Sequence, residues 1–350
     1  MFWKCPECLG DLAQSAEAVT CVSCGRRYPV VAELPDFRVD KPAWIDFDRD
    51  RDRALLIDAM IRSQGLEAAI YDVFRSSRGF DPAKCRFRTK QVLAGADKCD
   101  LQLDDWLKDA MVSPVLEVGV GPGQLTVALA RRGVSAHGID VSMEWLMVAK
   151  HRARAQGSEP VLAGAMAEKL PVADAAVASF ISLDVIEHVG DQDQYVRELG
   201  RVLRPGGRYA LVTPNRYSLS PEPHVGVWGV GYLPRPLQAS WVRAVAGVGY
   251  DYTRLLSTRE IRCMFQQRAG LEPTVKFPEI AEAEIGLFPP FKASIARTYN
   301  KIIAARIVQP VAPFVGAYFR VTGSKPLLSK PPPSNTPPTK PAAAAQKTGA

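Results

Sequence analysis

The sequence predicts an α/β protein with a doubly wound, mostly parallel sheet, preceded by a small metal-binding module and a helical segment. Three observations predict this class. From residue 113 onward, short apolar runs alternate with segments of helical periodicity, as they do in βαβ units. Two Cys-x-x-Cys pairs lie within the first 24 residues. The 350 residues are 47% hydrophobic and 23% charged, so the chain can bury a sizeable core.

The N-terminal module is predicted over residues 1–40, and its chemistry lies in four of the seven cysteines. Cys5 and Cys8 form the first pair, and Cys21 and Cys24 form the second. An odd number of cysteines makes a poor disulfide framework, whereas four thiolates complete a closed tetrahedral Zn²⁺ site in a reducing compartment. Because such a site keeps no open position, we expect it to be structural. A pair of redox dithiols is the alternative.

The surroundings of these cysteines carry a family resemblance over residues 1–37. The second pair is followed by Gly25, Tyr28, Pro29 and Pro35. This pattern resembles the zinc-ribbon family that includes the small activator subunit of tRNA and protein methyltransferases. The resemblance implies a module that docks on a methyltransferase, here within the same chain.

Residues 41–112 are predicted to form a linker and a helical segment. The charges of residues 41–53 alternate in sign, which suits a solvated linker or the start of a helix. Residues 54–112 carry apolar side chains at helical spacing and lack strand signals.

The main domain is predicted over residues 113–324, and a disordered tail rich in Pro, Lys and Ala over 325–350. The helices of the first half should end near residues 132, 155 and 203. The strands between them are expected at 115–120, 135–140, 159–164, 175–182 and 206–213.

The second half of the main domain is predicted to contain insertions at 216–256 and 285–313. Between them, Ser257 and Glu260 form a helix-start signal, and the helix should end at Gly270. A last, antiparallel strand is expected at 317–322.

A glycine-rich loop follows the first strand of the main domain. Residues 115–123 read Val-Leu-Glu-Val-Gly-Val-Gly-Pro-Gly, and Gln124 stands where a dinucleotide fingerprint has its third glycine. Glycines at such a turn let a ligand approach the backbone closely. Asp140 ends the second strand, where a carboxylate can accept bonds from two ribose hydroxyls; a helix cap is the alternative role.

Together with Ala165–Pro171 after the third strand and Pro205-Gly206-Gly207 before the fifth, this loop resembles class I S-adenosylmethionine-dependent methyltransferases over residues 113–285. The resemblance implies a seven-stranded Rossmann-like sheet and S-adenosylmethionine as cofactor. Within this class, the sequence resembles the group called methyltransferase type 11.

The resemblance also implies roles for single residues. Glu117 would orient the glycine loop and the methionine amino group, and Asp140 would hold the ribose diol. The glycines that would admit the cofactor are Gly119, Gly121 and Gly123.

Four further residues are expected beside the cofactor. Met143 would pack against adenine, Met166 and Ala167 would flank the adenine edge, and Leu183 would lie at the end of the fourth strand. Many family members have Asp where Met166 stands, so this position departs from the family pattern.

The segment after the fourth strand bears on the acceptor. It reads Leu183-Asp-Val-Ile-Glu-His-Val and lacks the Asn/Asp-Pro-Pro motif of enzymes that methylate nucleobase amines. It resembles the small-molecule and lipid O-methyltransferases, including quinone-ring enzymes, as does Thr213-Pro214-Asn215. His224 and His188 are the candidates for general base or acceptor contact. The alternatives are a loop histidine packed on Trp228 and a structural residue at a helix start.

The formal net charge of +7 is unevenly distributed. Residues 285–350 carry nine Lys or Arg and no Asp or Glu, so the rest of the chain sums to −2. Basic residues alternate there with apolar ones at helical spacing from Phe291 to Ile303, which favours contact with an anionic membrane surface. A helix that covers the sheet or the active site is the alternative.

The leading hypothesis is therefore O-methylation of a small, lipid-linked or glycosidic acceptor by a cytoplasmic protein, peripheral on the inner face of the membrane. The start of the chain lacks the form of a signal peptide, and no apolar run has membrane-spanning length. An rRNA or tRNA methyltransferase is one alternative, disfavoured because the basic excess lies outside the core. A non-catalytic binding protein with this fold is the other.

Overall fold

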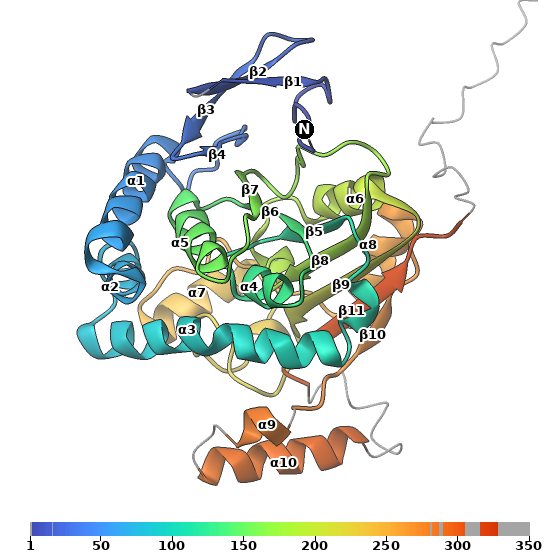
Figure 1. Cartoon of the computed structure of the whole chain (residues 1–350). Helices are drawn as coiled ribbons and strands as arrows, with labels where there is room; N and C mark the ends of the chain where they lie inside the picture. Colours follow the sequence, from blue (N-terminus) through green and yellow to red (C-terminus); the bar gives the residue numbers. More distant parts are fainter. Residues whose placement is uncertain (1, 16, 281, 287–289, 305–315, 328–350) are drawn as a thin grey trace, which may run out of the picture.

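The computed structural model describes residues 2–15, 17–280, 282–286, 290–304 and 316–327. Its centre is a seven-stranded sheet in the order β10-β11-β9-β8-β5-β6-β7 (Figure 1). The strands are β5 (Val115–Val118), β6 (Ala136–Asp140), β7 (Val161–Gly164), β8 (Val177–Leu183), β9 (Leu203–Pro214), β10 (Thr274–Lys276) and β11 (Tyr318–Ser324).

Five strands of this sheet are parallel and two are antiparallel. The strands β7, β6, β5, β8 and β9 run in one direction. The strand β11 pairs antiparallel with β9, and β10 pairs antiparallel with β11. The predicted doubly wound, mostly parallel fold is confirmed, as is the antiparallel strand expected near 317–322.

Helices cover both faces of the sheet, which explains why β5 and β8 are apolar and buried along almost their whole length. Right-handed crossovers place α4 and α5 on one face and α6 and α8 on the other. The bounds are α4 (Gln124–Arg131), α5 (Met143–Arg154), α6 (Gln192–Val202) and α8 (Thr258–Ala269). The predicted capping box of Ser257 and Glu260 begins α8, and Gly270 ends it at φ 62°.

The helical segment before the sheet packs on its α4–α5 face. The helix α1 (Phe47–Gln64) lies against α5, and α3 (Pro82–Asp104) lies against α4. Between them lie α2 (Leu66–Asp72) and a π-helical turn (Val73–Ser77). The side chain of Asp46 caps α1, so this helix begins within the charged stretch 41–53.

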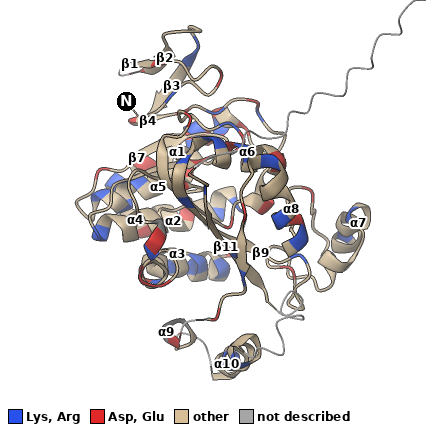
Figure 2. Ribbon diagram, turned by 90° about the vertical axis from the view of Figure 1, so that its right-hand side faces the viewer, with Lys and Arg blue, Asp and Glu red and all other residues tan. Residues whose placement is uncertain are grey.

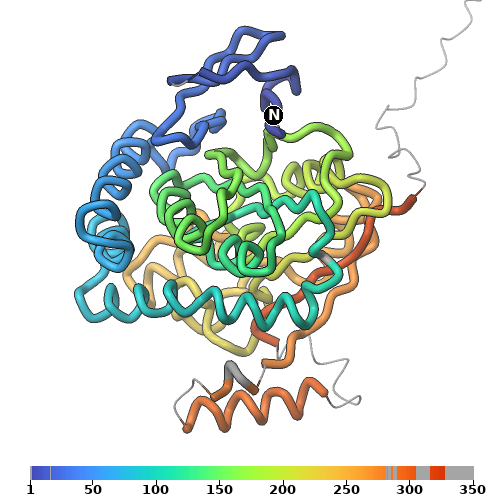
Figure 3. The backbone as a smooth tube through the Cα atoms, viewed as in Figure 1, coloured from blue at the N-terminus to red at the C-terminus, as the bar shows by residue number. Residues whose placement is uncertain are grey.

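The N-terminal module is a separate antiparallel sheet of four short strands, which docks on the β7 edge of the large sheet. Figure 3 shows the dark-blue start of the chain beside the green segment around β7. The Phe37 N–H donates to Gly164 O (2.7 Å), and the Lys4 N–H donates to Pro171 O (2.8 Å). Its strands are β1 (Leu12–Gln14), β2 (Ala18–Cys21), β3 (Arg27–Val31) and β4 (Leu34–Pro35).

Both insertions contain helices among the described residues. The first contains a 3₁₀ turn (Val230–Tyr232) and α7 (Arg235–Ala246), and the second contains α9 (Glu282–Ile285) and α10 (Pro290–Ala304). Short 3₁₀ turns also occur at Lys108–Ala110 and Ile186–His188.

The helices α9 and α10 lie apart from the sheet in the two perpendicular views of Figures 1 and 2. The Tyr299 hydroxyl donates to Pro278 O (3.0 Å), and the Asn300 amide donates to Ile280 O (2.7 Å). Phe291, on the apolar face expected from the sequence, is 77% exposed. Residues 287–289, 305–313 and 328–350 of the predicted membrane-binding segment and disordered tail lie outside the described residues. Among the described helices, none is long and apolar enough to cross a membrane.

Candidate active site at the carboxyl edge of the sheet

The glycine loop after β5 has a backbone that other residues adopt only with strain. Gly119, Gly121 and Gly123 have φ values of 81°, 50° and 75°. A Cβ on Gly119 would lie 2.1 Å from a methyl carbon of Val185, and one on Gly123 would lie 2.8 Å from Ala149 Cα. The loop therefore lies directly against the segment that follows β8, and Gly123 lets α4 begin close to α5.

Asp140 joins the end of β6 to this loop. One carboxylate oxygen accepts from the Gly121 N–H (2.7 Å) and the other from the Ser142 N–H (2.8 Å). Burial raises the pKa of Asp140, while the two backbone N–H groups lower it. Each oxygen keeps a free lone pair, so the fixed carboxylate can accept further bonds from a diol.

Glu117 lies inside β5 and is buried. The Thr126 hydroxyl donates to Glu117 Oε2 (2.6 Å). Burial raises the pKa of Glu117 to about 8, so the carboxyl is mostly protonated at neutral pH without a cation beside it. An ammonium group placed there would favour the ionised form.

A second group of side chains includes both predicted histidines: His188 comes after β8, and His224 comes after β9. The rings of His188 and His224 meet edge to face, with centroids 4.6 Å apart. The Glu222 carboxylate lies 2.5 Å from His224 Nδ1 and accepts from the backbone N–H groups of His224 and Val225 (2.8 Å each). These three bonds fix Glu222 and orient the His224 ring.

A buried carboxyl group, that of Glu187, directly precedes His188 in the chain. The Thr213 hydroxyl donates to Glu187 Oε2 (2.9 Å), whereas Glu187 Oε1 is buried and has no hydrogen-bond partner among the described residues. Burial and the neighbouring Asp184 raise the pKa of Glu187 to about 8. Burial and His224 lower the pKa of His188 to about 4, so this imidazole is neutral at pH 7.

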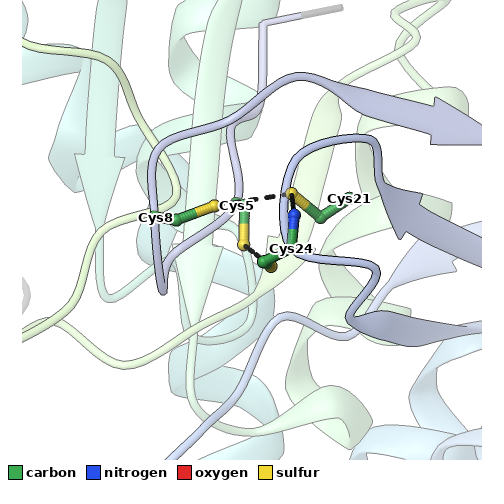
Figure 4. A group of neighbouring side chains, drawn as sticks. All are labelled: Cys5, Cys8, Cys21 and Cys24. Atoms are coloured by element: carbon green, nitrogen blue, oxygen red, sulfur yellow. Dashed lines mark hydrogen bonds between the residues drawn. The ribbon is translucent and has the colours of Figure 1, made fainter.

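The four N-terminal cysteines converge, as Figure 4 shows. Their sulfur atoms all lie within 4.8 Å of one another. The distance from Cys5 Sγ to Cys24 Sγ is 3.8 Å, and that from Cys8 Sγ to Cys21 Sγ is 3.5 Å. Backbone N–H groups of the second turn, Cys24 first, lower the pKa of Cys21 to about 6. Four thiols in this arrangement fit one tetrahedral ion.

Comparisons with known proteins identify the family of the main domain. Residues 116–211 match the family model of a methyltransferase domain. The ubiquinone biosynthesis O-methyltransferase of Dechloromonas aromatica is 30% identical over 177 residues, which cover 48% of this chain and 70% of that protein. This chain belongs to the S-adenosylmethionine-dependent methyltransferase family.

Two other similar proteins carry methyltransferase names. Methyltransferase GfsG of Streptomyces halstedii is 40% identical over 100 residues. These residues cover 28% of the present chain and only 36% of the length of GfsG. The solved structure of a methyltransferase from Thermotoga maritima is similar to this chain, with a TM-score of 0.42 and 19% sequence identity. The match covers 73% of this chain and 98% of the Thermotoga maritima chain. S-Adenosylmethionine is the cofactor of the family.

The remaining residues predicted to bind the cofactor lie around the ends of β6, β7 and β8. Met143 is fully buried, and its sulfur lies 2.5 Å from where a Cβ of Gly164 would be. Met166 and Ala167 are half-buried directly after β7, and Leu183 is half-buried at the end of β8. Their roles in binding S-adenosylmethionine stay predictions.

A buried ionic network links the N-terminal module to the loop after β6. The Arg38 guanidinium donates to Asp36 Oδ1 (2.7 Å), Asp50 Oδ2 (2.6 Å) and Val141 O (2.7 Å). The same Asp50 oxygen accepts from the Met143 N–H (2.8 Å). Arg38 is completely buried, so the residue next to Asp140 is held by a charge from the N-terminal module.

The sequence did not single out Glu222, Glu187 or Arg38 as site residues. The Trp228 ring stacks on Tyr232 and is 60% exposed, while His224 lies against His188. This placement disfavours the alternative of a loop histidine packed on Trp228. The Glu-His pair after β8 and the Pro-Glu-Pro-His run were the available signals, but only the fold brings them together.

Proposed function

We propose that this methyltransferase transfers a methyl group to a hydroxyl oxygen of a small, lipid-linked or glycosidic acceptor. The observation that carries the proposal is the His224–Glu222 pair, which lies beside His188. His188 is on the segment after β8, and Val185 of the same segment lies against Gly119 of the glycine loop. An imidazole with one nitrogen held by a carboxylate presents its other nitrogen to an acceptor proton. The sulfonium of S-adenosylmethionine supplies an already activated methyl group.

The chain would contribute binding, alignment and proton removal. Asp140 would accept the ribose hydroxyls, and Glu117 would ionise beside the methionine ammonium group. His224 Nε2 would take the hydroxyl proton as the O–CH₃ bond forms and the S–CH₃ bond breaks. Alignment of the two reacting atoms accounts for up to about 7–11 kcal/mol in such displacements.

Two observations favour an apolar or lipid-linked acceptor over RNA. The relatives named ubiquinone biosynthesis O-methyltransferases act, by that name, on oxygen. Next to the histidines, the insertion 216–256 exposes apolar side chains on α7 and before it: Trp228, Tyr232, Leu237, Trp241 and Val245 are each at least 41% exposed.

The test is methyl transfer from tritiated S-adenosylmethionine to a cell extract that is then separated into lipid, small-molecule, RNA and protein pools. Label is expected in the lipid or small-molecule pool. Asp140→Asn should abolish it by weakening cofactor binding, whereas His224→Ala should reduce turnover and leave cofactor affinity unchanged in calorimetry. Label confined to the RNA or protein pool would overturn the proposed acceptor class, and failure to bind S-adenosylmethionine would support a non-catalytic binding protein.

We also propose that the four N-terminal cysteines bind a structural Zn²⁺. The support is the convergence of their sulfur atoms in a module of about forty residues that has little core of its own. Elemental analysis of freshly purified protein should find at least one zinc per chain, and Cys5→Ser with Cys21→Ser should remove one. A zinc content near zero would contradict this proposal.

The basic excess of residues 285–350 supports a contact with an anionic membrane surface. Flotation with vesicles of anionic lipid should carry the natural chain upward more than a full-length variant in which Ser replaces the basic residues Lys292, Arg297 and Lys301 of α10 and Lys330, Lys340 and Lys347 of the tail. Equal flotation of the two chains would reject this contact, and cofactor binding would verify that the variant is folded.

A further inference from the structure

Glu187, His188 and His224 form a second group of metal-binding side chains, far from the four cysteines. From their arrangement we infer that they bind one divalent transition-metal ion at the acceptor side of the site. The ion's binding does not depend on the proposed function, but its role toward the acceptor does.

The geometry of the three donors is the first argument. One ligand atom from each residue lies within 4.8 Å of the other two. Donor atoms that are each about 2.1 Å from a common ion lie about 3–4 Å from one another. Shifts of about 1 Å in the positions of these ligand atoms, through side-chain rotation, would therefore complete the site. The donors come from two segments, the turn after β8 and the insertion at 216–256. These segments are already in contact, because the rings of His188 and His224 meet edge to face.

The buried oxygen of Glu187 is the second, independent argument. Glu187 is 1% exposed, and its Oε1 has no hydrogen-bond partner in the part of the chain that the structure describes. A buried carboxylate oxygen without a partner is costly and rare in native proteins. A cation between Glu187 and the two imidazoles would satisfy this oxygen.

Hydrogen bonds orient both histidine rings. His224 Nδ1 faces Glu222, which leaves Nε2 for an ion, and His188 has a hydrogen bond with the backbone of Tyr252. Metal-binding histidines are commonly oriented in this way through their second nitrogen. Glu222 is therefore a positioning residue here, not a ligand.

The donor set decides the kind of ion. Two imidazole nitrogens and one carboxylate oxygen suit Mn²⁺, Fe²⁺, Co²⁺ or Zn²⁺, whereas Mg²⁺ and Ca²⁺ prefer oxygen ligands alone. Three protein ligands leave open positions on such an ion. The thiolates of the N-terminal cysteines prefer Zn²⁺, so Mn²⁺ distinguishes the two sites.

The open positions define an acceptor class within the proposed function: a hydroxyl that has a second oxygen next to it, as in a catechol. The ion would bind both oxygens and lower the pKa of the hydroxyl, whose proton is released to solvent. The O–CH₃ bond would then form while the S–CH₃ bond breaks, with the electrons of that bond remaining on sulfur. With the ion bound, His224 Nε2 is a metal ligand, and the ion replaces His224 as the group that activates the hydroxyl in the proposed function.

The test is a Mn²⁺ titration of the full chain loaded with a single equivalent of Zn²⁺, which the four thiolates take, followed by electron paramagnetic resonance. One Mn²⁺ per chain should bind, and Glu187→Gln and His224→Ala should each weaken this binding at least about tenfold. His151→Ala, on α5, is the matched control and should bind Mn²⁺ normally. Calorimetry with S-adenosylmethionine would verify that each variant is folded.

Two outcomes would overturn the inference. One is the absence of Mn²⁺ binding together with a zinc content that stays at the single ion of the cysteine site after zinc loading. The other is unchanged Mn²⁺ binding in Glu187→Gln. Methyl transfer separates the two proposals: a base at His224 predicts nearly normal turnover in Glu187→Gln, whereas the metal site predicts loss of turnover on chelation and recovery with added Mn²⁺.

Discussion

The cofactor side and the acceptor side of the active edge are built by different means. At the ends of β5 and β6, glycines and backbone N–H groups define the site, and a buried carboxylate joins two loops. At the ends of β8 and β9, imidazoles and carboxylates from a long insertion define it, with exposed aromatic side chains around them. A site made of backbone tolerates few substitutions, whereas a site made of side chains on an insertion can change its acceptor without rebuilding the sheet.

The largest expected effect on the cofactor side is that of Arg38→Met. The substitution removes the cation from Asp50 and leaves Asp36 with Arg51 alone, which should cost about 3–5 kcal/mol of the free energy of unfolding. It should also weaken S-adenosylmethionine binding, because Asp50 holds the Met143 N–H next to Asp140. Urea denaturation and calorimetry measure the two effects.

Arg26→Met is the matched control for this prediction. Arg26 is half-exposed and pairs with Glu7 on the N-terminal module, so its loss should cost about 1 kcal/mol or less. Equal losses for Arg26→Met and Arg38→Met would mean that the buried network does not stabilise the cofactor side.

Gly119→Ala should have the next largest effect, because Gly119 is where the two sides touch. A Cβ there has both an unfavourable φ of 81° and a contact of 2.1 Å with Val185, together about 2–3 kcal/mol. Gly133→Ala, with φ 68° and open space around it, should cost only about 1 kcal/mol. Thermal denaturation measures the loss of stability in the two variants. Similar losses would show that the Val185 side chain moves aside at little cost.

The raised pKa of Glu117 should make the stability of the chain depend on pH. This pKa rises from 4.5 to about 8 in the folded chain, so the folded state binds more protons than the unfolded state in that window. The free energy of unfolding should therefore fall as pH rises, by up to about 2 kcal/mol between pH 6 and 7.5.

Glu117→Gln should reduce the fall by the share of Glu117, and it should weaken S-adenosylmethionine binding at the same time. Glu187, whose pKa is also raised to about 8, should contribute a similar share, which Glu187→Gln should remove. Urea denaturation of the cofactor-free protein at the two pH values measures the slope. A slope that is the same in Glu117→Gln and in the natural chain would contradict the role of Glu117.

The smallest effect on stability is expected on the acceptor side, at Leu237→Ser. Leu237 is 55% exposed on α7, so the free energy of unfolding should change by about 0.5 kcal/mol or less and cofactor affinity should not change. The KM for an apolar acceptor should rise. Val22→Ser, 70% exposed on the N-terminal module, should leave all three quantities unchanged; a similar rise in KM there would remove the role of α7.

Local patterns predicted much of the fold. The alternation of apolar runs and helices predicted the parallel sheet with helices on both faces, and the Ser257–Glu260 signal predicted the start of α8, because these features depend on neighbours in sequence. The glycine loop and the cysteine pairs were visible for the same reason.

The rest depends on contacts between distant residues. Arg38 and Val141 O are 103 positions apart, and the Glu222–His224 pair reaches His188 from a separate loop. On α10, the periodic pattern offered Phe291 and Ile295 either to a membrane surface or to packing against the rest of the chain; the structure leaves both exposed and buries Ala293 and Ala296. Small side chains allow a closer approach between helices, and a hydrophobic pattern does not record this.

The continuity of the chain between the N-terminal module and the sheet has a consequence for how the cofactor site assembles. Because Phe37 pairs with Gly164 within one polypeptide, docking of the module is a unimolecular event with a high effective concentration. A module supplied by a separate subunit would dissociate on dilution. Here the occupancy of the docked state is independent of protein concentration, so cofactor affinity should be the same at nanomolar and micromolar enzyme.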